Sequence, residues 1–231
     1  MGELFEKFFP NGVKSLEQNF SIDPVWKEEI NKWLACVYEI DTKYFERSKT
    51  RVTQDIWKQE ETLAELRSIY FLKEKLGCTI LALEPDRLDL TFTDKNGEKW
   101  FAEIKCPSYV KEILERDLSP KEKLERKQQP KNILETFSFD FNGYSDCIKK
   151  SVDKFESGKK NLLIISDDRM LSLVGDPFFE GNIKNELKQN DPDGKISAVL
   201  LLNVQGKLVG NFETKIEYIH RVATITGNPV F

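Results

Sequence analysis

The chain has 231 residues, of which 39% are hydrophobic and 32% charged, and its formal net charge is −4. This composition is typical of a soluble globular protein and is too rich in Phe, Leu and Ile for a disordered chain. The acidic balance provides no overall basic surface, so any contact with nucleic acid must depend on a local patch. No apolar run approaches the roughly 20 residues of a membrane span, and the first residues lack a signal-peptide pattern. We therefore expect no membrane partner.

Cysteine and histidine usage narrows the chemistry further. The four cysteines lie far apart in the sequence, and the single histidine is His220. A zinc site of ordinary spacing is not expected, and neither are disulfides, which favours a cytoplasmic location. No serine or cysteine pairs with His220 in a nucleophile–base pattern, and the sequence contains no G-x-x-x-x-G-K-[ST] loop for nucleoside triphosphates.

The first 52 residues are expected to form a helical extension packed on the main body. Asp23 and Pro24 make a good helix start, with proline at the first helical position. Apolar residues then recur near helical spacing, at Val25, Ile30, Trp33, Leu34 and Val37. Helices in front of a core can act as a structural cap, grip DNA or form a homodimer, and the sequence leaves these roles open.

Residues 53–231 predict one α/β domain. A helix is expected from Thr53 to Leu76, ended by Gly77. Strands are expected near 78–85, 87–93, 98–107, 161–166 and 196–204, with further strand at 207–227; helices near 145–157 and 182–189; and a charged insert at 108–143. The continuous apolar runs NLLIIS and ISAVLLLNV are typical of strands buried on both faces. The fold class is therefore α/β, a central mixed β-sheet flanked by helices.

The hairpin formed by 87–93 and 98–107 is expected to separate polar from apolar side chains. Successive residues of a strand point to opposite faces. One face collects hydrophobic residues, Leu88, Leu90, Phe92, Trp100, Ala102 and Ile104. The other face collects Asp89, Thr91, Thr93, Phe101, Glu103 and Lys105. Aspartate, glutamate and lysine side chains are thus predicted to share one face.

The turn of this hairpin predicts which acids lie opposite each other. A three-residue loop ending at Gly97 would put that glycine in the left-handed conformation and pair Asp94 with Glu98. The same register sets Asp89 opposite Glu103. Because adjacent carboxylates repel each other, something must offset their charge. A hard cation such as Mg²⁺ does so well, since it prefers carboxylate and phosphate oxygens.

Lys105 lies two residues beyond Glu103 and points to the same side. A lysine there can neutralise the acids, orient an attacking water, or stabilise charge that develops on a phosphate. An ordinary ion pair on an exposed polar face is the alternative.

The preceding helix offers a further acid. Glu65 shares an otherwise apolar stripe with Ile69, Leu72 and Leu76, so it is expected to point toward the sheet. A carboxylate in that position needs a partner, which a metal site or the neighbouring lysine would supply. Glu61, one turn earlier, is the alternative for the same role.

Together these residues resemble the PD-(D/E)XK nuclease superfamily, the restriction-endonuclease-like fold. The matching segments are ETLAELRSIYFLKEKLG, EPDRLDLTFTDKNG and KWFAEIKCP, and the resemblance spans roughly residues 53–204. It implies that Asp89 and Glu103 bind Mg²⁺, with Mn²⁺ as a substitute, and that the backbone carbonyl of Ile104 also ligates. It further implies that Lys105 assists the attacking water and that Glu65 supports the site.

The literal Pro-Asp of this motif occurs at Pro85-Asp86. If the strand already runs there, Asp86 faces the core together with Leu88 and Leu90. Asp89 is therefore the preferred first acid, and Asp86 is the second choice.

Basic residues for a DNA partner are expected in two places. Between Lys105 and Lys131, eight lysines and arginines outnumber five acids, so this insert is more basic than the chain as a whole. The candidates for phosphate contact are Lys121, Lys123, Arg126 and Lys127, with Lys149 and Lys150 on the helix after the insert. Alternating charges of this kind are also typical of a solvated helix or loop.

The sequence thus predicts a Mg²⁺-dependent nuclease that hydrolyses phosphodiester bonds in DNA, an endonuclease of the restriction, repair or mobile-element type. The alternative is a non-catalytic DNA-binding or assembly module on the same fold.

Overall fold

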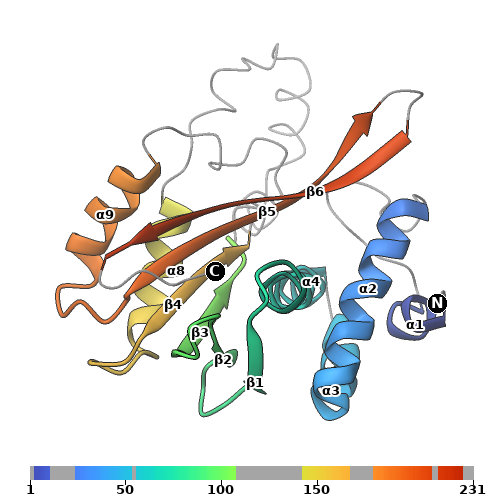
Figure 1. Ribbon diagram of the computed structural model, residues 1–231, viewed down its shortest axis with the longest axis horizontal. Coiled ribbons are helices and arrows are strands. Elements are labelled where there is room, and N and C mark those ends of the chain that lie inside the picture. The colour runs from blue at the N-terminus through green and yellow to red at the C-terminus, as the bar shows by residue number, and fades with distance from the viewer. Residues whose placement is uncertain are drawn as a thin grey trace, which may run out of the picture.

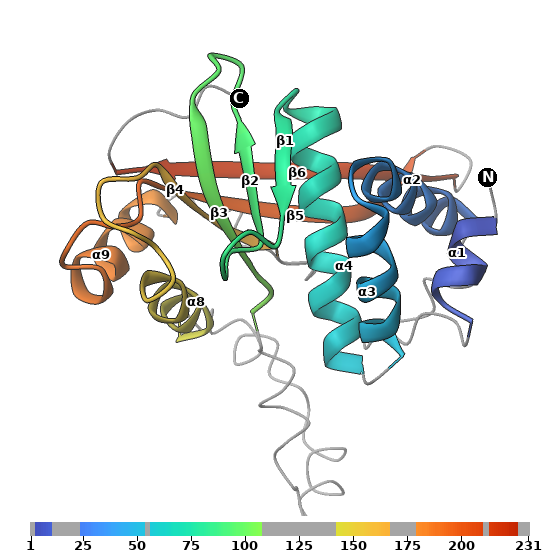
Figure 2. The same ribbon diagram turned by 90° about the horizontal axis from the view of Figure 1, so that it is seen from below.

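A computed structural model describes residues 3–10, 24–53, 56–107, 142–166, 179–209 and 213–225. These residues form a six-stranded sheet in the order β1-β2-β3-β4-β5-β6, and helices cover it on both sides (Figure 1). Figure 2 shows α1 to α4 gathered on one side and α8 and α9 on the other. The expected α/β class, a mixed sheet flanked by helices, is confirmed.

The bounds of the elements follow the chain from end to end. The helices are α1 (Glu3–Phe8), α2 (Pro24–Ile40), α3 (Thr42–Val52), α4 (Ile56–Tyr70), the π-helix η1 (Phe71–Lys75), α8 (Asn142–Val152) and α9 (Phe179–Asn190). The strands are β1 (Thr79–Leu83), β2 (Leu90–Thr93), β3 (Lys99–Lys105), β4 (Asn161–Ser166), β5 (Ala198–Val209) and β6 (Glu213–Thr224). The pairs β3–β4 and β4–β5 are parallel and the other neighbouring pairs are antiparallel.

Hydrophobic side chains pack in two clusters, one on each face of the sheet. Alternate residues of β4 divide between them: Leu162 and Ile164 join α1 to α4, and Leu163 and Ile165 join α8 and α9. All four side chains are fully buried. The apolar run NLLIIS was expected to form a strand buried on both faces, and this is confirmed.

The N-terminal segment is helical, as expected, and α2 begins at Pro24. Asp41 caps α3 because its carboxylate accepts the backbone N–H groups of Lys43 and Tyr44 at 2.8 and 2.9 Å. The Trp33 indole donates to the Tyr218 hydroxyl on β6 at 2.5 Å. These helices share one core with the sheet, and the boundary expected at residue 52 stays a prediction.

The long helix that follows differs from expectation in its last turn. It continues from α4 into the π-helix η1, where the Leu76 N–H donates to the Phe71 carbonyl five residues earlier at 3.0 Å. Gly77 then has a φ of +67° and ends the helix, as the sequence predicted.

The approach to β2 is turned rather than extended, which corrects the expected strand at 87–93. Glu84, Asp86 and Arg87 have φ values of 50°, 42° and 79°, a left-handed conformation that costs energy for residues other than glycine. The strand therefore begins at Leu90, and Leu88 packs on the α8 and α9 side instead of sharing a face with Leu90. Asp86 is exposed, so it does not face the core.

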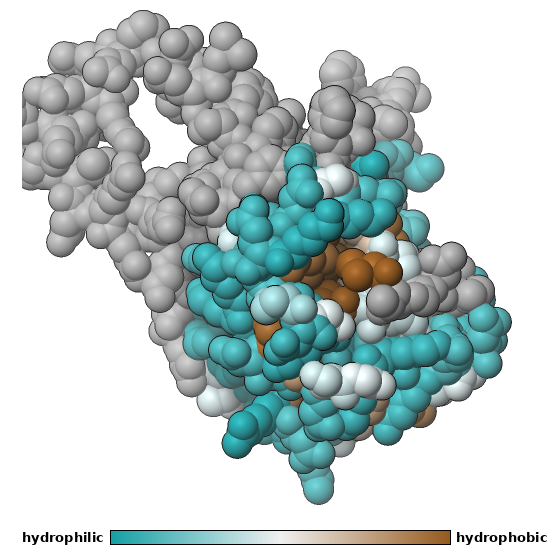
Figure 3. Space-filling model, turned by 90° about the vertical axis from the view of Figure 1, so that its left-hand side faces the viewer, coloured by the Kyte–Doolittle hydropathy of each residue, from teal (hydrophilic) through white to brown (hydrophobic). Residues whose placement is uncertain are grey.

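Hydrophilic residues cover most of the described surface on the side of the molecule where α9 lies in Figure 1, and hydrophobic residues are visible in one hollow there (Figure 3). Within the ranges given above, every helix is too short or too polar to cross a lipid bilayer.

Candidate active site

The hairpin of β2 and β3 has the register that its turn predicts. Leu90 lies opposite Ala102 and Phe92 lies opposite Trp100. Gly97 has a φ of +78°, and its N–H donates to the Asp94 carbonyl at 2.9 Å. The expected apolar face is confirmed from Leu90 onward, because the side chains at 90, 92, 100, 102 and 104 are buried in the cluster beneath α4.

Asp89 directly precedes β2 and turns its carboxylate toward β3. One carboxylate oxygen, Oδ2, accepts the backbone N–H of Ile104 at 2.6 Å, and the Asp89 N–H donates to the Ala102 carbonyl at 3.2 Å. Burial and the nearby charge of Glu103 raise the pKa of Asp89 to about 7. The charge of Glu103 thus acts on Asp89, but the pairing of β2 with β3 is recorded only from Leu90 and Ala102 onward, so the placement of Asp89 directly opposite Glu103 stays a prediction.

Glu103 is fully buried on the opposite face of β3 from the α4 cluster. Its Oε1 accepts hydrogen bonds from two ammonium groups, those of Lys105 and Lys154. Its Oε2 is also buried and has no hydrogen-bond partner among the described residues. Since a buried carboxylate oxygen without a partner costs free energy, this atom is suited to a ligand that the protein does not itself provide.

Lys154, in the turn after α8, belongs to the site but was not predicted from the sequence. Burial is the largest single influence and would lower its pKa, but the hydrogen bond to Glu103 and the negative charges of Glu103 and Asp89 together outweigh burial, so the pKa lies above its ordinary value. The candidates expected on this helix, Lys149 and Lys150, are exposed in its last turn, and Glu103 accepts from Lys154 instead. The helix ends at Val152 rather than near 157, and this early end brings Lys154 to Glu103.

The helix acid Glu65 is largely buried near Asp89, but it has a different partner from the one expected. Arg51 of α3 donates to both carboxylate oxygens, at 2.5 and 3.2 Å, and the Tyr44 hydroxyl donates as well. Burial raises the pKa of Glu65 and Arg51 opposes that rise, while Glu65 in turn raises the pKa of Arg51. The alternative acid, Glu61, is exposed and pairs with Lys58 at 2.7 Å.

Two arginines of α3 also contact the turned segment before β2. Arg51 and Arg47 both contact the carboxylate of Glu84, at 3.5 and 2.8 Å. Glu84 also donates its N–H to the Asp89 carbonyl at 2.7 Å. The N-terminal helices therefore hold the backbone that carries the first acid.

The donor set fits a hard cation in one respect and falls short in another. Asp89 and Glu103 offer two nearby carboxylates, one with a buried oxygen that lacks a partner. In the described part of the chain, no group of three or more His, Cys, Asp or Glu side chains could hold a metal ion. A cation here would need backbone, water or phosphate oxygens to complete its shell, which is how Mg²⁺ is usually bound.

The basic candidates of the insert, Lys121, Lys123, Arg126 and Lys127, lie outside the described residues. All four cysteines lie within the described residues, and none of them forms a disulfide bond there. His220, on β6, packs against Phe71 with the centroids of the two rings 5.0 Å apart, and burial lowers the pKa of His220.

Comparisons with known proteins add little beyond this. No family model and no curated protein sequence matches the chain. A solved structure described as Pyrococcus furiosus SfsA in complex with Ca²⁺ is similar at 20% sequence identity and a TM-score of 0.26. The similarity covers 70% of this chain and 60% of that protein.

Proposed function

We propose that the chain is a Mg²⁺-dependent nuclease of the PD-(D/E)XK kind that hydrolyses phosphodiester bonds in DNA, as an endonuclease of restriction, repair or mobile-element type. One observation carries the proposal: buried Glu103 binds two lysines through one oxygen and leaves the other without a described partner, beside Asp89. An ion pair that served only stability would be expected to use both oxygens.

In this proposal Asp89 and Glu103 hold the cation through their carboxylates, and the carbonyl of Ile104 contributes as the superfamily resemblance implies. The ion, when bound, would neutralise phosphate charge and lower the pKa of the attacking water. The hydrogen bond from the Ile104 N–H to Oδ2 fixes the orientation of the Asp89 carboxylate.

The lysines would act on the substrate. Lys105 is half-buried and held by Glu103, so its ammonium group is oriented before substrate arrives. From there it can hold the attacking water or stabilise the negative charge that builds on the phosphate oxygens. Lys154 approaches the same carboxylate from the α8 side and would contribute a second positive charge near that phosphate.

Plasmid cleavage in Mg²⁺ tests the proposal. The wild type should cut, and Asp89→Ala and Lys105→Ala should each be slower by about 100-fold or more. Lys188→Ala changes an exposed lysine of α9 and serves as the matched control. Equal cutting by the wild type and the two site variants would contradict the assignment of the site.

The alternative, a non-catalytic DNA-binding or assembly module, is favoured by the ion cluster that Lys105 and Lys154 already form on Glu103. It predicts DNA binding without cleavage and without any dependence on a divalent cation.

A further inference from the structure

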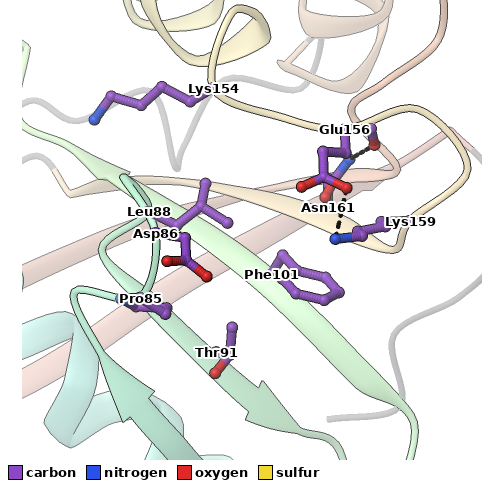
Figure 4. A pocket seen from close by; sticks show the side chains of 9 residues that line it. All are labelled: Pro85, Asp86, Leu88, Thr91, Phe101, Lys154, Glu156, Lys159 and Asn161. Atoms are coloured by element: carbon purple, nitrogen blue, oxygen red, sulfur yellow. Dashed lines mark hydrogen bonds and ion pairs between the residues drawn. The ribbon is translucent and has the colours of Figure 1, made fainter.

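A small polar pocket lies beside the candidate active site and shares Lys154 with it. Its volume is about 60 Å³, and it opens between the start of the β2–β3 hairpin and the loop that joins α8 to β4 (Figure 4). Asp86 and Phe101 lie on the hairpin side, and Lys159 and Asn161 on the loop side. Apart from Lys154, the residues that line this pocket have no role in the chemistry proposed at Glu103.

Asn161 gives the pocket an acceptor without a partner. The residue is 1% exposed, and its Nδ2 donates to the backbone carbonyls of Glu156 and Lys195, both at 2.8 Å. Because both partners are carbonyls, the amide cannot be turned the other way. Its Oδ1 is left buried with no hydrogen-bond partner among the described residues, so a donor from a ligand would remove a real free-energy cost.

Phe101 provides a half-buried aromatic ring at the same pocket. It precedes Glu103 by two residues on β3, so both side chains lie on one face, about 7 Å apart along the strand. The Lys159 ammonium lies 4.6 Å from the ring centroid, and that of Lys99 lies 5.1 Å from it. Aromatic rings flanked by lysines are typical of sites that stack a nucleobase and bind its phosphates.

Charge in the pocket favours a ligand with two ends of different chemistry. The exposed carboxylate of Asp86 and the orphan oxygen of Asn161 both accept hydrogen bonds. The Lys154 ammonium pairs with Glu103 and the Lys159 ammonium with Glu156, whose carboxylate also lines the pocket, so a bound phosphate would replace a carboxylate as the partner of each lysine. A nucleotide whose base carries an amino group fits these partners, because the amino group can donate to the acceptors and the anionic phosphate can bind the lysines.

We propose, resting on the nuclease function above, that this pocket binds one unpaired nucleotide next to the phosphate that is cut. The base stacks on Phe101 and its amino edge reaches Asn161 and Asp86, while Lys154 and Lys159 contact its phosphates. Lys159 is exposed, and its ammonium group would leave the Glu156 carboxylate, 2.6 Å away, and the Phe101 ring to bind a phosphate. The pocket is smaller than a nucleobase, so only the amino edge of the base would enter it, and the rest of the base would lie at its opening against Phe101.

A paired base cannot bind in this way, because its faces are stacked and its pairing edge is occupied. The substrate class is therefore DNA with a single-stranded stretch at the cut, such as a flap, gap or displaced strand. Among bases, cytosine should be preferred over thymine, since cytosine presents an amino donor where thymine presents a carbonyl.

Fluorescence anisotropy with the full chain tests this, with Ca²⁺ in place of Mg²⁺ and probe integrity checked on a gel. The probes are oligodeoxycytidine, oligothymidine and a blunt duplex of equal length. The wild type should bind oligodeoxycytidine about fivefold more tightly than oligothymidine. Phe101→Ala should weaken single-strand binding about tenfold, while Phe101→Trp retains it. Duplex binding should be unchanged by either, and Lys188→Ala should match the wild type throughout.

The outcomes separate the two proposals. A folded Phe101→Ala variant with wild-type affinity for single strands, or a preference for oligothymidine, overturns the nucleotide pocket while plasmid cleavage still supports a nuclease. Phe101-dependent binding of single strands without any cleavage supports the pocket and overturns the nuclease. Absence of binding to all three probes overturns the pocket as well.

Discussion

Glu65 and Glu103 are both buried carboxylates near Asp89, yet their surroundings differ in kind. Glu65 accepts from Arg51 on both oxygens and from the Tyr44 hydroxyl, so its hydrogen-bonding capacity is used within the fold. Glu103 uses one oxygen for two lysines and leaves the other without a described partner. A carboxylate satisfied by its own chain stabilises the fold, whereas one with an open buried oxygen is suited to bind something else.

The largest expected effect is on cleavage. Glu103→Gln should slow Mg²⁺-dependent plasmid cleavage by about 1000-fold, because it removes a proposed ligand and the anchor of both lysines. Glu65→Gln, its matched counterpart on α4, should slow cleavage by less than about tenfold, since Glu65 does not contact the reacting atoms in this proposal. If the two substitutions slowed cleavage equally, the proposed difference in role between Glu65 and Glu103 would be wrong.

Glu65→Gln, which should have little effect on cleavage, should have a large effect on the free energy of unfolding. Glu65→Gln breaks a largely buried ion pair and leaves Arg51 with only the more distant carboxylate of Glu84, so the free energy of unfolding should fall by about 3 kcal/mol. Glu61→Gln, whose ion pair with Lys58 is exposed, should change it by less than about 0.5 kcal/mol. Urea unfolding monitored by circular dichroism measures both values. A loss from Glu65→Gln no larger than that from Glu61→Gln would contradict the structural role of Glu65.

The raised pKa of Asp89 predicts a pH effect in the metal-free protein. Its folded pKa of about 7 lies above the ordinary value of 3.8, so ionising Asp89 costs more in the folded state than in the unfolded one. Stability should therefore fall as pH rises from about 4 to 7. From pH 5 to pH 8 the advantage of Asp89→Asn over the wild type should grow by about 2 kcal/mol, allowing for partial solvent screening. Urea unfolding in EDTA checks this, and an advantage that stays constant with pH would contradict it.

The smallest effect concerns Lys154. Lys154→Ala should slow cleavage about tenfold, because one of two ammonium groups on Glu103 is lost while Lys105 remains. Lys149→Ala, on the exposed side of α8, should leave the rate unchanged. If Lys149→Ala were the more damaging change, the expectation from the sequence would be right and the contact seen in the structure would be unimportant.

The features that the sequence predicted correctly are local ones. Alternation along β2 and β3, together with a glycine at the turn, determines which side chains share a face and which residues pair. The register of Leu90 with Ala102 follows from those two facts alone. The apolar run of β4 likewise needs no knowledge of its neighbours to predict burial on both faces.

The features that were missed depend on contacts between distant segments. Tyr144, Ile148, Ser151 and Phe155 continue one helical stripe, so nothing in the pattern reveals that α8 ends at Val152 and delivers Lys154 to Glu103. Arg51 reaches Glu65 only because α3 packs beside α4. The left-handed backbone of Glu84, Asp86 and Arg87 could not be predicted from the sequence pattern. Because the chain turns there, Asp86 is exposed instead of facing the core.

Binding of Mn²⁺, measured by isothermal titration calorimetry on the full chain, tests the contrast between Glu65 and Glu103 most directly. The wild type and a folded Glu65→Gln variant should bind the ion, and Asp89→Asn and Glu103→Gln should not. Failure of the wild type to bind, or binding that survives both of the last two substitutions, would contradict the assignment of the open carboxylate oxygen to a metal site.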